Sequence, residues 1–195
     1  MVRLLVPLLV SLTTTLVTAQ AQDQGRFELG LIPGALLKLE LSSGNYKIES
    51  GAADRLIIQS LARNPEEQKK VRFGLSATRQ EASVKVNGPA QLDVTIQIPK
   101  NVNLSVRLNG GRLTLTGVEG DKDIESNAGQ VSINIGKPQD YRAIDASVTV
   151  GDIEARALPG VRDGPMRSLN ATGPGKYRLH VHLGSGQIRL LTEEL

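Results

Sequence analysis

Two histidines are the first side chains in this sequence that could support chemistry. His180 and His182 lie two residues apart in an apolar-polar alternation, so both project to the same side of a predicted strand. Two imidazoles could bind a metal ion, but such a site normally needs a third protein ligand. Neighbouring residues such as Arg178 and Gln187 supply no carboxylate. We therefore expect solvent-facing histidines, with no metal and no cofactor.

A second group could support acid-base chemistry on a polysaccharide. It comprises Arg142, Asp145, Asp152, Glu154 and Arg156. A β-helix lyase or hydrolase carries such residues along one outer face of stacked strands, but a carboxylate pair is defined by its separation in space. Outward charges also solvate a sheet and discourage edge pairing. We favour this structural role and predict no catalytic residues, with a carbohydrate-active β-helix enzyme as the alternative.

Composition excludes several classes of function. The chain has no Cys, which removes Cys-based zinc sites, thiol catalysis and disulfide scaffolds. Aromatic residues make up 3% of the chain, which disfavours base stacking and sugar stacking on aromatic platforms. A formal charge of +3 gives no electrostatic reason to expect nucleic acid as a partner. No nucleophile elbow, phosphate-binding loop or dinucleotide fingerprint is present.

The first 21 residues are typical of an export signal. Arg3 precedes an apolar run over residues 4–17, and Ala19-Gln20-Ala21 fits the small-x-small pattern of signal peptidase sites. The run is shorter than the ~20 apolar residues of a membrane span. We expect cleavage after Ala21, no transmembrane anchor in the mature chain, and a periplasmic or extracellular, cell-surface location.

Apolar residues alternate with polar ones from Leu36 onward, as strands buried on one side require. Helical periodicity is nearly absent; residues 64–70 could form a helical turn, with Pro65 at its first position, or a charged loop. The sequence predicts a single all-β domain over residues 36–191. A lead-in over residues 22–35 precedes it, and a short tail over residues 192–195 follows.

Five ten-residue segments can be written in one register, each with glycine at its sixth position. The segments are 39–48, 106–115, 124–133, 146–155 and 181–190, with glycines Gly44, Gly111, Gly129, Gly151 and Gly186. Glycine adopts positive φ, or permits close backbone approach, where a strand turns a corner into the next. The repeat favours a β-solenoid or β-helix-like domain. An antiparallel β-sandwich is the alternative, because the motif does not specify which strands pair.

Segments such as IESNAGQVSI, SVTVGDIEA and HLGSGQIRL resemble the "putative adhesin" family of bacterial exported β-strand-repeat proteins. The likeness covers roughly residues 36–191, and Gly151-Asp152-Ile153 matches the repeat pattern fully. The resemblance implies a β-solenoid-like, envelope-associated domain with no established enzymatic activity. It implies no binding residues.

The segment 158–175 is rich in proline and glycine and predicts a long surface excursion between the fourth and fifth repeats. Long loops often bind partners, so Arg162, Asp163 and Arg167 are the first candidates for a binding loop.

These features together predict a non-enzymatic, adhesin-like binding or scaffolding module at the bacterial cell envelope. Its partner would be an unidentified polysaccharide or protein of the envelope or surface, and not nucleic acid. Self-association is also an expectation, because the first repeat and the final strand near Leu190 could present open sheet edges.

Overall fold

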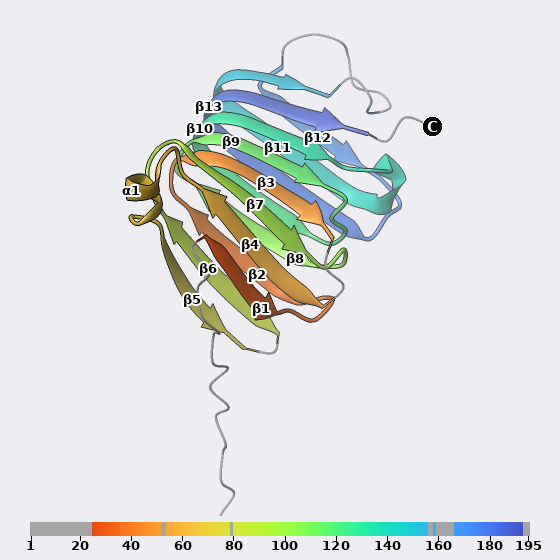
Figure 1. Cartoon of the computed structure of the whole chain (residues 1–195). Helices are drawn as coiled ribbons and strands as arrows, with labels where there is room; N and C mark the ends of the chain where they lie inside the picture. The colour runs from red at the N-terminus through yellow and green to blue at the C-terminus, as the bar shows by residue number, and fades with distance from the viewer. Residues whose placement is uncertain (1–24, 52–53, 79, 156–157, 159–165, 193–195) are drawn as a thin grey trace, which may run out of the picture.

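The computed structural model describes residues 25–192, apart from residues 52–53, 79, 156–157 and 159–165 (Figure 1). The predicted export signal lies outside the described residues, and so do Arg156, Arg162 and Asp163. Within the described ranges, no helix is long and apolar enough to cross a membrane.

The prediction of an all-β chain is confirmed. The described residues form one 13-stranded mixed sheet with two very short helices, α1 (Pro65–Gln68) and the 3-10 helix η1 (Pro138–Asp140). The strands are β1 (Arg26–Gly30), β2 (Leu36–Leu41), β3 (Gly44–Ser50), β4 (Arg55–Leu61), β5 (Arg72–Ala77), β6 (Glu81–Asn87), β7 (Leu92–Ile98), β8 (Asn103–Leu108), β9 (Gly111–Thr116), β10 (Lys122–Asn134), β11 (Tyr141–Glu154), β12 (Ser168–Thr172) and β13 (Tyr177–Leu191).

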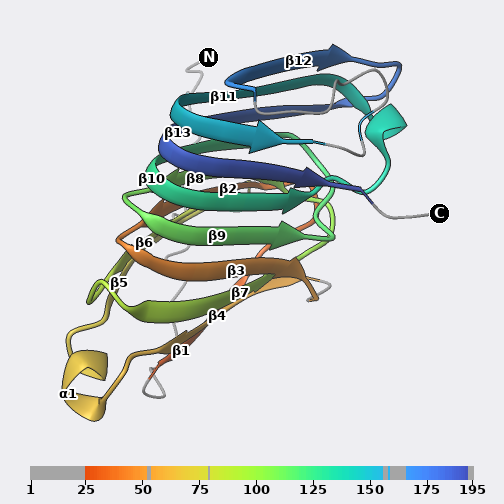
Figure 2. The same cartoon turned by 90° about the horizontal axis from the view of Figure 1, so that it is seen from above.

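The sheet curls on itself into two walls that enclose the core (Figure 2). The first wall contains β5, β6, β2, β8, the first halves of β10, β13 and β11, and then β12. The second wall contains β1, β4, β7, β3, β9 and the second halves of the same three long strands. Alternate side chains of both walls point inward and form one mainly aliphatic cluster. The repeated strands pair in parallel and the antiparallel pairs lie toward the edges, which differs from the antiparallel sandwich alternative.

The strands stack in an order that differs from their order in the chain. β2 lies between β6 and β8, and β3 lies between β7 and β9, so the first repeat is inside the stack. The final strand, β13, is inserted between β10 and β11. The expectation that these two parts present open edges is therefore wrong. Among the described strands, β1, β5 and β12 each pair on one side only.

The five repeat glycines stand in one column at the corner between the walls. Their order across the stack is Gly44, Gly111, Gly129, Gly186 and Gly151. All except Gly44 have φ between +109° and +135°. A Cβ on Gly129 would overlap the carbonyl oxygen of Gly111, so the corner requires glycine both for backbone conformation and for space.

Three segments outside the repeats also have defined places. The lead-in contains β1, whose Phe27 and Leu29 are buried in the core. The helical turn α1 begins at Pro65, and the Asn64 side chain caps it by accepting a hydrogen bond from the Glu67 amide at 2.9 Å. Part of the expected excursion over residues 158–175 is instead strand β12, which pairs with β11 because Leu169 packs into the core.

Candidate functional site

The carboxylates selected from the sequence are distributed over both walls. Asp145 lies in the first half of β11, on the outer surface of the first wall, and Arg142 precedes it there. Asp152 and Glu154 lie in the second half of β11, on the outer surface of the second wall. The corner at Gly151 separates the two groups, so Asp145 and Asp152 do not face a common space.

Each of these carboxylates contacts a polar side chain on the neighbouring strand β13. The pairs are Asp145 with Arg178 at 3.8 Å, Asp152 with Gln187 at 3.0 Å, and Glu154 with Arg189 at 3.3 Å. In the same way, Arg142 lies 3.6 Å from Asp121, the residue before β10. These contacts join strands sideways.

The two histidines lie on the outer surface of the first wall. The Nδ1 atom of His182 is 2.9 Å from the Ser147 hydroxyl oxygen, with which it shares a hydrogen bond. His180 stands in register between Asp123 of β10 and Asp145 of β11. In the part of the chain that the structure describes, no three His, Cys, Asp or Glu residues are grouped so that they could hold a metal ion.

The outer surface of the first wall carries opposite charges on neighbouring strands; we call this set, Lys85, Glu40, Arg107, Asp123 and Glu125, the charge ladder. Arg107 of β8 lies 2.9 Å from Asp123 and 3.1 Å from Glu125, both on β10. Farther down the wall, Lys85 of β6 lies 3.0 Å from Glu40 of β2. A groove of about 470 Å³ crosses the starts of β2, β8, β10 and β13; its lining includes Lys38, Ser105, Asp123 and His180. The wall therefore offers a polar, in-register surface about five strands wide around this groove.

The candidate binding loop is described only in part. Arg167 is exposed and immediately precedes β12. Its backbone carbonyl accepts a hydrogen bond from the Val148 amide at 2.9 Å, which ties this end of the segment to β11. Arg162 and Asp163 lie outside the described residues, so the loop remains a sequence prediction.

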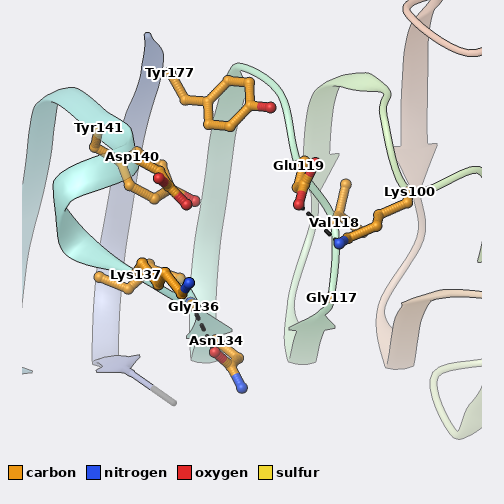
Figure 3. A pocket seen from close by; sticks show the side chains of 11 residues that line it. Lys100, Gly117, Val118, Glu119, Asn134, Gly136, Lys137, Asp140, Tyr141 and Tyr177 are labelled. Atoms are coloured by element: carbon orange, nitrogen blue, oxygen red, sulfur yellow. Dashed lines mark hydrogen bonds and ion pairs between the residues drawn. The ribbon is translucent and has the colours of Figure 1, made fainter. Parts of the chain in front are cut away.

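A second polar hollow lies on the side of the stack opposite the glycine column, where loops connect the second wall back to the first. We call it the loop-side cleft (Figure 3). One side is formed by residues 117–119, between β9 and β10, and the other by residues 134–141, which lead from β10 into β11. Its volume is about 320 Å³, which lies in the range of small-molecule sites.

Opposite charges face each other across the loop-side cleft (Figure 3). Lys137 and Asp140 extend from one side, and Glu119 with Lys100 from the other. The Lys100 ammonium lies 2.9 Å from a Glu119 carboxylate oxygen, and this hydrogen bond lowers the pKa of Glu119 below its ordinary value. The remaining side is bounded by Tyr177 at the start of β13.

A buried lysine, Lys122, contacts the two tyrosines that line the cleft. Lys122 is 2% exposed, and its ammonium lies 2.9 Å from the Gly120 carbonyl oxygen and 3.0 Å from the Tyr141 hydroxyl. The same ammonium lies 5.1 Å from the Tyr141 ring centroid and 5.7 Å from that of Tyr177. Burial lowers the pKa of Lys122 to about 8, against the opposing effect of the Asp121 and Glu119 charges. Burial also raises the pKa of the Tyr141 phenol.

Sequence reasoning missed the loop-side cleft, although two signals pointed toward it. Lys122 lies two residues before the buried Ile124, so strand alternation places its side chain on the same inward face. Tyr141 and Tyr177 are two of only three tyrosines in the chain. Neither signal reveals that loops from different repeats meet at this end, because that depends on the stacking order.

Comparisons with known proteins support the fold and leave the family open. No protein-family model matches the chain, and no curated protein matches it in sequence. One solved structure that it resembles is a "putative cell adhesion protein" from Clostridium sporogenes ATCC 15579. The TM-score is 0.54 at 12% sequence identity, and the match covers 86% of this chain and 99% of that chain. The chain is therefore similar to this protein in fold over most of its length.

Proposed function

We propose that this protein is a non-catalytic, adhesin-like binding or scaffolding module that is exported and acts at the bacterial cell envelope. The observation that carries the proposal is the charge ladder on the outer surface of the first wall. Neighbouring strands present its side chains in register, with a spacing of about 4.8 Å from strand to strand. Such a surface suits an extended or repetitive partner, because a charge of the same sign recurs at every second strand, as Lys85 and Arg107 do.

Three further points support this proposal. The N-terminal sequence has the pattern of an export signal. The similar solved protein carries a name that refers to cell adhesion, and it shares the fold over 86% of this chain. The lateral pairing of Asp145, Asp152 and Glu154 gives these residues a role in joining strands that requires no catalysis.

The test is retention of the mature protein, residues 22–195, by washed cell-envelope fractions. We expect retention at about 0.05 M NaCl that falls severalfold at about 0.5 M, because salt screens contacts between exposed charges. Arg107→Glu should lower retention by placing a third acid beside Asp123 and Glu125. Arg112→Glu is the matched control, since Arg112 is an exposed arginine on the second wall.

Two results would overturn the proposal. One is the absence of retention by any envelope fraction at low salt. The other is the release of product from a panel of polysaccharides, with that activity lost in Asp145→Asn. Equal loss of retention in both arginine variants would count against the first wall as the contact surface.

A further inference from the structure

The loop-side cleft has the features of a ligand site separate from the charge ladder. It lies among loops on the side away from the glycine column, whereas the ladder lies on the outer surface of the first wall. We propose that this cleft binds one hexose-sized unit of a neutral glycan through hydrogen bonds to its hydroxyl groups. This inference rests on the proposed binding function and names a ligand class for it.

The charges of the cleft are balanced, which disfavours a simple ion as its ligand. Its lining contains two ammonium groups, Lys100 and Lys137, and two carboxylates, Glu119 and Asp140. Ammonium groups only donate hydrogen bonds, and ionised carboxylates only accept them. A sugar hydroxyl both donates and accepts, so one ring with several hydroxyls can satisfy both kinds of group at once.

The aromatic residues of the cleft are engaged by cations and by each other, so they do not form a stacking platform for a sugar. The Tyr177 ring has the Lys176 ammonium 4.7 Å and the Lys122 ammonium 5.7 Å from its centroid. Tyr141 is 3% exposed, and its ring meets that of Tyr177 edge-on with centroids 6.1 Å apart. Recognition by polar groups therefore agrees with the aromatic-poor composition, which disfavours sugar stacking.

The residues that line the cleft are already ordered before a ligand binds. Glu119 is fixed by Lys100, and its amide donates to the Lys100 carbonyl oxygen at 2.7 Å. On the other side, the Asn134 side chain accepts a hydrogen bond from the Gly136 amide at 2.9 Å. The Lys122 ammonium anchors Tyr141, which immediately follows Asp140. Groups that are already ordered lose less entropy on binding, which favours a weakly attractive ligand such as a sugar.

The experiment uses the mature protein and three tetrasaccharide probes: a neutral hexose oligomer, an N-acetylhexosamine oligomer and a hexuronate oligomer. Binding is followed by NMR amide shifts and by calorimetry at pH 7. We expect a neutral probe to bind and to shift the amides of residues 117–119, 134–137 and 139–141. Affinity should change little between about 0.05 M and about 0.5 M NaCl, because a neutral ligand is not screened.

Asp140→Ala should weaken binding of the neutral probe by about tenfold or more. The control is Asp152→Ala, which removes a carboxylate from the outer surface of the second wall and should leave binding unchanged. Melting temperatures of both variants check that they fold. The inference is overturned if neither neutral probe binds, if the shifts fall on the outer surfaces of the walls, or if Asp140→Ala binds like the wild type. Envelope retention without glycan binding would refute this inference and leave the proposed function standing; glycan binding without salt-dependent retention would do the reverse.

Discussion

The two long sides of the strand stack differ in how regular their backbone is. At the glycine column, the same backbone geometry recurs from strand to strand, and residues from five repeats stand opposite one another. On the opposite side, each loop has its own length and composition, and here the buried Lys122, two tyrosines and the loop-side cleft are found. The repeats thus form the scaffold, and the loops that depart from the repeat form the loop-side cleft.

The largest expected effect tests the glycine column. Gly129→Ala adds a Cβ that overlaps the Gly111 carbonyl oxygen, at a residue with φ of +124°. We expect a loss of about 3 kcal/mol or more in the free energy of unfolding, measured by urea denaturation. The control on the loop side is Gly136→Ala, where φ is +64° but no atom lies within 4 Å of the added Cβ. Its cost should be about 1 kcal/mol, from backbone strain alone. Equal costs would remove the distinction between the two sides.

The next effect concerns the pH dependence caused by Lys122. Its pKa of about 8 in the folded protein lies below the ordinary value of 10.5, so the unfolded chain binds more protons between these values. The free energy of unfolding should therefore rise with pH from about 8 to about 10, by up to roughly 3 kcal/mol. The raised pKa of Tyr141 opposes this rise from about pH 10 upward, because the unfolded tyrosine loses its proton around its ordinary value of 10.0.

Urea denaturation at pH 7.5 and pH 10 measures this rise, and Lys122→Met should remove it. If the Met variant keeps the same pH dependence as the wild type, the source of the effect lies elsewhere in the protein.

A smaller effect is expected for the tyrosine that pairs with Lys122. Tyr141→Phe removes the hydroxyl 3.0 Å from the buried ammonium, and we expect a cost of about 1–2 kcal/mol at pH 7. The comparison near the glycine column is Tyr46→Phe. The Tyr46 hydroxyl lies 3.2 Å from the neutral Ser42 hydroxyl, so its removal should cost less free energy of unfolding. If Tyr46→Phe lowers the free energy of unfolding more than Tyr141→Phe does in denaturation experiments, the hydrogen bond between Tyr141 and Lys122 has no special role in stability.

The smallest effect is expected on the outer surface of the first wall. The side chains of Arg107, Asp123 and Glu125 are 44–47% exposed. Exposed ion pairs contribute little to stability, so Arg107→Ala should change the free energy of unfolding by no more than about 0.5 kcal/mol. A loss well above this in thermal or urea unfolding would mean that the charge ladder holds the stack together and is not simply available for contact.

Much of the scaffold could be predicted from the sequence. Alternation over segments such as Leu92–Ile98 predicted strands with one buried side, and the structure places these residues in β7. The common register of the five segments is also present, since their glycines pair with one another across the stack. Proline at the start and asparagine at the cap of α1 correspond to local rules that operate within a few residues.

The partners of each strand could not be predicted, and the errors follow from this. The sequence predicted open edges at the first repeat and at the strand near Leu190, yet both lie inside the stack. Leu169 lies in a segment read as a loop, but it is buried because β12 covers the edge of β11. Each strand pairs with a sheet edge whose inward-facing side chains are also apolar, and these side chains come from residues far apart in the chain.

The sequence by itself determined the all-β class, the inward and outward faces of the strands, and the positions where the chain must turn. These follow from local causes: period-two alternation, and the freedom of glycine at positive φ. Only the tertiary structure decided that β13 enters between β10 and β11, and that loops around Lys100, Glu119, Lys137 and Asp140 meet in one cleft. The physical reason is that burial and hydrogen bonding of whole strands select the stacking order, and this order brings distant side chains together.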